Sequence, residues 1–101
     1  MTRAVLALSM AVAGSPVAAL SPTEEVALDC LGSPRPVWLV ICADATLTAL
    51  AIAERAMARG RAPLDDMAFL SDRDRCALGP APTACLTDLY IRRIERLGRS
   101  G

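Results

Sequence analysis

The chain contains no histidine, lysine, asparagine or glutamine, and it has one residue of each aromatic type. Because histidine is the side chain most often used for acid–base catalysis near neutral pH, its absence removes the usual catalytic triads and the commonest metal ligand. The sequence also lacks a glycine-rich phosphate loop, a nucleophile elbow and a metal-binding motif. Asp65 with Asp66 and Asp72 with Asp74 are paired carboxylates, but acids at the start of a helix more often stabilise the helix than catalyse a reaction. We therefore predict that the protein is not an enzyme and uses no cofactor and no metal.

An excess of charge of one sign is also absent, since 11 basic residues, all of them arginine, balance 11 acidic residues. A neutral domain with mixed charges lacks the electrostatic attraction that drives nucleic-acid binding. The densest basic segment, residues 92–96, includes a glutamate and is typical of the solvated face of a helix. We predict no nucleic-acid partner and no basic membrane-binding patch.

The first residues have the three-part form of a secretory signal. A short positive start and an apolar stretch over residues 4–13 precede helix-breaking residues and a small-residue cleavage site that ends at Ala19. The apolar stretch is shorter than the ~20 residues that a membrane-spanning helix needs. We therefore interpret residues 1–19 as a signal peptide rather than a membrane anchor. This predicts a mature domain over residues 20–101, periplasmic or secreted, with no stable membrane span after cleavage.

The mature domain has four cysteines, Cys30, Cys42, Cys76 and Cys85. An even number of cysteines in a small exported domain is typical of structural disulfides, because such a domain has a limited core. Redox exchange would call for a C-x-x-C motif, and zinc binding for closer cysteines or for histidines, neither of which is present. Of the three connectivities we favour local pairing, Cys30 with Cys42 and Cys76 with Cys85.

Local signals predict helices in the first half of this domain. Residues 21–24 form a capping-box pattern with proline at the first helical position, so a short helical turn is expected there. Residues 31–36 are rich in turn formers and predict a link. The apolar run over residues 37–42 fits a strand, which its β-branched residues favour, or a helix. Asp44 as an N-cap and Gly60 as a stop bound a helix of about four turns.

Two further helices are expected over residues 64–76 and 83–97, joined by a Gly- and Pro-rich turn. The residues expected to face inward are Leu64, Met67, Ala68 and Leu70 in the first helix, and Leu86, Leu89, Tyr90, Ile94 and Leu97 in the second. The charged residues of the first helix, Arg73 among them, are expected to face largely outward. The second helix is expected to end at Gly98, before a disordered tail. With a cysteine on each side of the turn, the predicted fold class is all-α, a small disulfide-stapled helical domain with an antiparallel hairpin in its C-terminal half.

Four short motifs follow one another along the domain: Asp29-Cys30, then Ile41-Cys42-Ala43-Asp44 with Leu47 and Leu50, then Phe69-Leu70-x-x-Arg73-Asp74-x-Cys76, and finally Cys85-Leu86-x-x-x-Tyr90-x-x-Arg93-Ile94-x-x-Leu97. In this order they resemble the small secreted bacterial family named for the lysozyme inhibitor LprI. The resemblance implies a compact helical domain with two disulfides, a helix over residues 37–42, and binding of lysozyme-type muramidases. The chain departs from the family pattern at Trp38 and Ala51, where the family usually has acids, so it looks like a divergent member.

Arg73, Asp74 and Trp38 are the candidate partner-binding residues. A planar guanidinium beside a carboxylate suits either an acidic cleft or a basic surface of a partner, and the alternative is an internal ion pair that orients the hairpin elbow. Trp38 is either an exposed anchor for a partner or a core residue beside the first disulfide. The predicted function is steric occlusion of a protein partner such as a muramidase. The alternative is a structural or stress-related protein of the cell envelope.

Overall fold

The computed structural model describes residues 20–60 and 63–100. Every regular element in these ranges is a helix, which confirms the predicted all-α class. The helices are α2 (Pro22–Gly32), α3 (Pro36–Cys42), α4 (Ala45–Ala58), α5 (Pro63–Ala77) and α6 (Pro82–Ser100). The predicted signal peptide, residues 1–19, lies outside the described residues.

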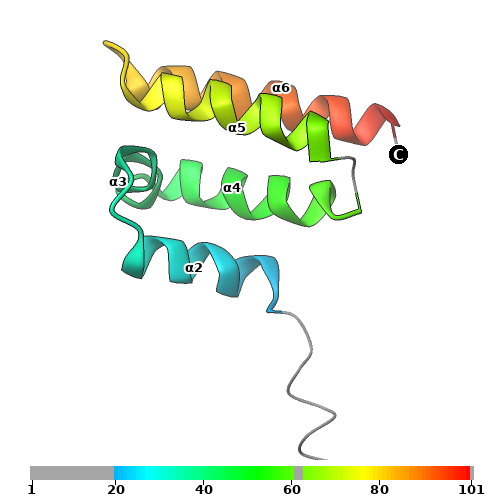
Figure 1. The fold of residues 1–101 in the computed structure, drawn as a ribbon, viewed down its shortest axis with the longest axis horizontal. Coiled ribbons are helices and arrows are strands. Elements are labelled where there is room, and N and C mark those ends of the chain that lie inside the picture. The colour runs from blue at the N-terminus through cyan, green and yellow to red at the C-terminus, as the bar shows by residue number, and fades with distance from the viewer. Residues whose placement is uncertain (1–19, 61–62, 101) are drawn as a thin grey trace, which may run out of the picture.

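The central helix of the domain is α4. It lies between α2 on one side and the α5–α6 pair on the other, and α3 crosses one end of this stack (Figure 1). Its most extensive packing is against α6, while α5 packs on α6 and on α3. The antiparallel hairpin predicted for the C-terminal half is therefore confirmed, and α3 fills the end of the molecule where the hairpin turns.

The first described helix, α2, begins with the predicted capping box. The Ser21 hydroxyl accepts a hydrogen bond from the Glu24 N–H at 3.1 Å, and the Glu24 carboxylate accepts one from the Ser21 N–H at 2.8 Å. The helix continues for 11 residues, so it is longer than the expected turn and includes the start of the expected link. Its length follows from packing, because Val26 is buried and Cys30 is bonded to α3.

Residues 36–42 form a helix, as the family resemblance implied, and the strand preference of the β-branched residues is wrong here. Pro36 occupies the first turn, where its missing N–H costs nothing. Val37, Trp38 and Ile41 are all at most 4% exposed, and this i, i+1, i+4 spacing places them on one face of a helix. Packing of that face overrides the weak intrinsic preference for a strand.

Both predicted boundaries of α4 are confirmed. The Asp44 carboxylate accepts a hydrogen bond from the Leu47 N–H at 2.9 Å, which caps the start. Gly60 has a φ of 81°, the left-handed conformation that glycine adopts at little cost after a helix. Leu47, Ala51 and Glu54 are buried at i, i+4 and i+7, so an acid occupies the apolar face of this helix.

The buried face of α5 differs from the predicted one. Phe69, Arg73 and Cys76 are buried at i, i+4 and i+7. The residues that we expected to face inward are exposed, namely Met67, Ala68 and Leu70, and the side chain of Leu64 lies outside the described residues. The prediction failed because arginine was assigned to the outer face, whereas the Arg73 guanidinium lies over the Trp38 ring in the interior.

The last helix, α6, continues through Gly98 to Ser100, so the predicted stop is wrong and residues 98–100 of the predicted tail are helical; Gly101 lies outside the described residues. Gly98 does not have the positive φ found at Gly60. A Cβ at position 98 would lie 3.7 Å from the Met57 side chain, so the glycine lies where α6 passes α4. The predicted apolar stripe of α6 is buried or half-buried along its length: Leu86, Leu89, Tyr90, Ile94 and Leu97.

Both predicted disulfides are present. Cys30 is bonded to Cys42 and Cys76 to Cys85, with Cα–Cα distances of 5.7 and 5.5 Å. The first joins the last turns of α2 and α3, and the second closes the elbow between α5 and α6. All of these helix ends lie at the end of the molecule that α3 crosses (Figure 1).

Candidate partner-binding site

Trp38 is a core residue, as the second of the two interpretations predicted. It is 4% exposed, and the guanidinium carbons of Arg55 and Arg73 lie 5.3 and 5.1 Å from its ring centroid. Cations over an indole face are attracted to its π electrons, most strongly when water is excluded. Trp38 therefore connects α3 to α4 and α5 and does not present its ring to a partner.

Arg73 and Asp74 form the internal ion pair that was the alternative to partner binding. A nitrogen of the Arg73 guanidinium lies 3.6 Å from Asp74 Oδ1, and Arg35 lies 3.4 Å from Asp74 Oδ2. The Arg73 side chain is 5% exposed and that of Asp74 is 39% exposed. Asp74 Oδ1 and Arg73 Nε are buried without a hydrogen-bond partner. Of the three candidate residues, Asp74 is the one that a partner can reach.

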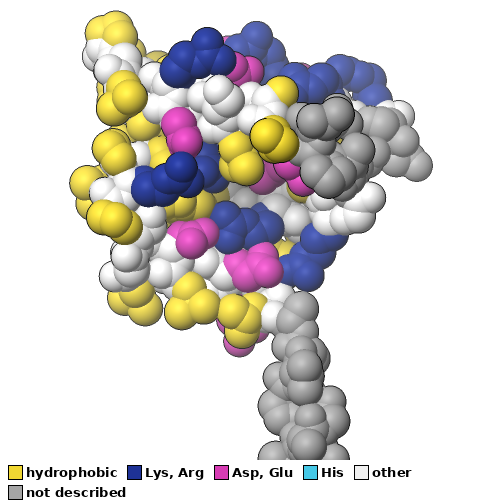
Figure 2. All heavy atoms as spheres, in the orientation of Figure 1, with side chains coloured by type: hydrophobic (Ala, Val, Ile, Leu, Met, Phe, Trp, Pro, Cys, Tyr) yellow, Lys and Arg dark blue, Asp and Glu magenta, His cyan; other side chains and the backbone are white. Residues whose placement is uncertain are grey.

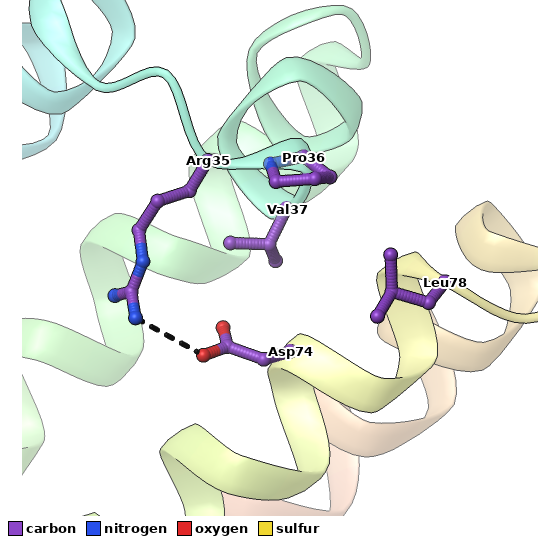
Figure 3. Close-up of a pocket in the computed structure, with 5 residues that line it drawn as sticks. All are labelled: Arg35, Pro36, Val37, Asp74 and Leu78. Carbon is purple, nitrogen blue, oxygen red and sulfur yellow. Dashed lines mark ion pairs between the residues drawn. The ribbon is translucent and has the colours of Figure 1, made fainter.

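A pocket of about 120 Å³ lies beside Asp74, between the start of α3 and the elbow that follows α5. Figure 3 shows the Arg35 side chain extending to the Asp74 carboxylate, with the apolar side chains on the other side of the space. The lining residues are Arg35, Pro36, Val37, Asp74 and Leu78. The pocket therefore combines aliphatic walls with one carboxylate and one arginine.

Three leucines, one of which lines this pocket, are the most exposed large hydrophobic residues of the described chain. Leu31, Leu39 and Leu78 are 85%, 68% and 75% exposed and come from α2, α3 and the elbow; we call this surface the apolar end. Figure 2 shows hydrophobic side chains along the edge of the molecule formed by α3 and the elbow. Exposed apolar surface that gathers at one part of a molecule is a candidate interaction site. In the sequence, the apolar end is indicated by the segment from residue 77 to residue 87, which has no charged residue.

A buried ionic network between α4, α5 and α6 was not predicted. Arg93, which is 4% exposed, donates to Glu54 at 3.1 Å, donates to Asp66, and lies over the Phe69 ring at 4.9 Å. The single guanidinium bridges the two carboxylates, holds both in place and offsets one of their two charges, which suits a structural role. The helical spacing of these residues in the sequence could have revealed the network. Glu54 falls in line with the apolar residues of α4, and Arg93 falls in line with those of α6.

Tyr90 packs edge-on against Phe69, with 5.2 Å between the ring centroids, and it is 1% exposed. Burial raises the pKa of Tyr90 above its ordinary value of 10.0 and is the dominant effect. The charge and hydrogen bonding of Arg73 act in the opposite direction, as does the charge of Arg55, whereas Glu54 raises the pKa of Tyr90 further. The folded state thus holds the phenol proton more tightly than the unfolded chain does.

This difference in pKa predicts alkaline sensitivity. The stabilisation should be complete below the pKa of Tyr90 in the unfolded chain and should be lost as pH rises through the higher pKa of the folded state. The chain has one tyrosine and no lysine, and its cysteines are bonded, so tyrosinate absorbance reports on this site alone. We expect tyrosinate to appear together with loss of helical circular dichroism. Tyr90→Phe should remove this pH dependence, and a tyrosine that titrates at its ordinary pKa in the folded protein would contradict the prediction.

The fold and its two covalent links define a small, disulfide-bonded, all-α protein, and the disulfides indicate an oxidising, extracytoplasmic environment. In the described part of the chain no single helix is long and apolar enough to cross a membrane. Helices α3 and α4 together have the length and composition of a membrane span, but the chain bends by 112° between them. Within the same residues, no group of three His, Cys, Asp or Glu side chains is placed to hold a metal ion. Comparison with protein-family models, curated proteins and solved structures found no match.

Proposed function

We propose that the protein is a periplasmic or secreted binding protein of the LprI-like type, which occludes a muramidase through its apolar end. The observation that carries this proposal is the exposure of Leu31, Leu39 and Leu78 together at one end of a rigid domain. Exposed leucine side chains favour association because a partner that buries them removes their apolar surface from water. The signal-like sequence of residues 1–19 and the disulfides support a location outside the cytoplasm.

The chemistry of the apolar end favours a protein partner over a lipid surface. Binding to anionic membranes relies on clustered basic residues, but the pocket at this end contains Arg35 as its single cation, paired with Asp74. Both disulfides lie at this end and fix the helix ends that carry the leucines. A surface that is already ordered loses little conformational entropy when a partner binds.

One observation favours the alternative of an envelope protein without inhibitor activity. At the two positions where the LprI-like family usually has acids, this chain has Trp38 and Ala51, which are 4% and 2% exposed. Both side chains belong to the core, so whatever the acids of the family contribute has no counterpart at these positions. This alternative retains the apolar end as a binding surface and changes the partner.

Substitution of the exposed leucines tests the proposal. We expect the oxidised mature protein to bind a muramidase and to protect cells or peptidoglycan from lysis, and we expect Leu39→Asp and Leu78→Asp each to weaken binding about tenfold or more. Met67→Asp is the matched control, because Met67 is 62% exposed on α5 and does not belong to the apolar end. Calorimetry measures binding, and a turbidity assay measures lysis.

Three results distinguish the alternatives. Binding with protection that both leucine substitutions weaken supports the proposal. Binding without protection favours the envelope role. Failure of the wild-type protein to bind or protect at stoichiometric excess, across muramidases of different types, would rule out the inhibitor function.

A further inference from the structure

We propose that the pocket beside Asp74 is a receptor for a lysine side chain of the protein partner, with the Asp74 carboxylate as its acceptor and Arg35 as a displaceable occupant. This assignment names the chemistry recognised at the apolar end, and it rests on the proposed function to the extent that the lysine belongs to a partner protein.

The size and walls of the pocket suit an alkyl chain with a polar tip. Its volume of about 120 Å³ corresponds to roughly four water molecules at about 30 Å³ each, which is close to the size of the butylammonium part of lysine. Pro36, Val37 and Leu78 provide aliphatic walls, and Leu78 is 75% exposed at the elbow. The methylenes of lysine pack well on such walls while its ammonium group stays at a polar site.

The carboxylate of Asp74 has unused capacity as an acceptor. Its Oδ1 atom is buried without a hydrogen bond, although an ionised carboxylate offers about four lone-pair sites. Its Oδ2 atom is 3.4 Å from the Arg35 guanidinium, and neither contact is a hydrogen bond of normal length. An ammonium group has three donors and can reach the exposed Oδ2 atom at normal hydrogen-bond length, which Arg35 does not do at 3.4 Å.

The pair between Arg35 and Asp74 is easy to displace. Its side chains are 60% and 39% exposed, and ion pairs so exposed contribute little because water and salt screen them. Arg35 lies at the N-cap of α3 without a side-chain cap hydrogen bond, so its side chain can turn into solvent. Because the lysine replaces Arg35 while Arg73 stays at 3.6 Å, the number of cations facing Asp74 does not change.

In the first test, butylammonium chloride is titrated into the wild-type protein, and NMR monitors the chemical shifts of the Val37 and Leu78 methyl groups. We expect saturable shifts with a dissociation constant of about 10 mM, as suits a ligand of five heavy atoms. Butanol, which has the same length and no charge, should bind at least about tenfold more weakly if the carboxylate is the acceptor. Equal shifts with both probes, or none with butylammonium, would overturn the proposal without any variant having to fold.

Variants then locate the acceptor. Asp74→Asn should abolish butylammonium binding, whereas Asp72→Asn, on the same helix but paired with Arg75, should leave it unchanged. Arg35→Ala should strengthen binding two- to threefold, roughly the effect of removing a weak competitor. Weaker binding to the Arg35 variant, or stronger binding of butylguanidinium than of butylammonium to the wild type, would contradict a lysine receptor gated by Arg35.

The two proposals fail in different ways. If the muramidase function is wrong, the wild-type protein will not bind the enzyme, but butylammonium will still titrate the pocket. If the lysine receptor is wrong, the wild-type protein and Asp74→Asn will bind a muramidase equally well. When both proposals hold, Asp74→Asn should weaken muramidase binding about tenfold and Asp72→Asn should not.

Discussion

Arg93→Ala should destabilise the domain by about 3–5 kcal/mol, because it leaves the buried Glu54 carboxylate without its counter-charge. Glu54 is 8% exposed and accepts from Arg93 at 3.1 Å. The substitution also removes the cation over the Phe69 ring and the hydrogen bond to Asp66. Urea denaturation followed by far-UV circular dichroism measures the loss, which is a large part of the ~5–15 kcal/mol that stabilises a typical domain.

Two variants separate the charge effect from the loss of side-chain volume. Arg92→Ala removes the neighbouring arginine, whose side chain is 62% exposed and paired with Asp88, and it should change stability by less than about 0.5 kcal/mol. Arg93→Met combined with Glu54→Met should recover much of the lost stability, because apolar residues replace both buried charges. An Arg93→Ala protein within about 1 kcal/mol of wild type would show that the network is not structural.

Removal of both disulfides is the second large effect that we expect. The bonded cysteines are 12 and 9 residues apart, and in the chain-entropy model loops of this size contribute about 3 kcal/mol each. Loss of about 6 kcal/mol in total approaches the whole stability of a small domain. The reduced and alkylated protein should therefore be largely unfolded at about 37 °C.

The paired variants Cys30→Ala with Cys42→Ala, and Cys76→Ala with Cys85→Ala, divide this effect between the two bonds. Each should fold at low temperature with a lower midpoint of denaturation, and their losses should add because the bonds close separate loops. Unchanged helical circular dichroism and an unchanged melting transition after full reduction would show that the core alone holds the fold.

The sequence predicted the elements that depend on local chemistry. The cap at Asp44, the stop at Gly60 and the capping box at Ser21 each involve residues within one turn of one another, and all three are present. The local pairing of the cysteines was also right, because short loops close readily. Residues 36–42 could not be assigned from propensity alone, since the burial of Trp38 against α4 and α5 decides their conformation.

Tertiary contacts explain what the sequence did not reveal. Two arginine side chains that we expected at the surface are buried. The Arg73 guanidinium packs over the Trp38 ring, and the Arg93 guanidinium packs over the Phe69 ring. Gly98 did not end α6, because the helix still packs on α4 at this position. Asp74 was a candidate from the sequence, but Arg35 and Leu78 of the same pocket were missed because they are distant in sequence and meet only where α3 crosses the elbow.

The placement of both disulfides at one end gives the molecule unequal resistance to opening. The start of α2 and the last turns of α4 and α6 are held by non-covalent contacts, including the ion pairs of Glu25 with Arg55 and Arg59, so thermal fraying should begin there. The opposite end stays tied together while the rest loosens. A partly melted molecule would thus still keep the three leucines of the apolar end in their folded arrangement.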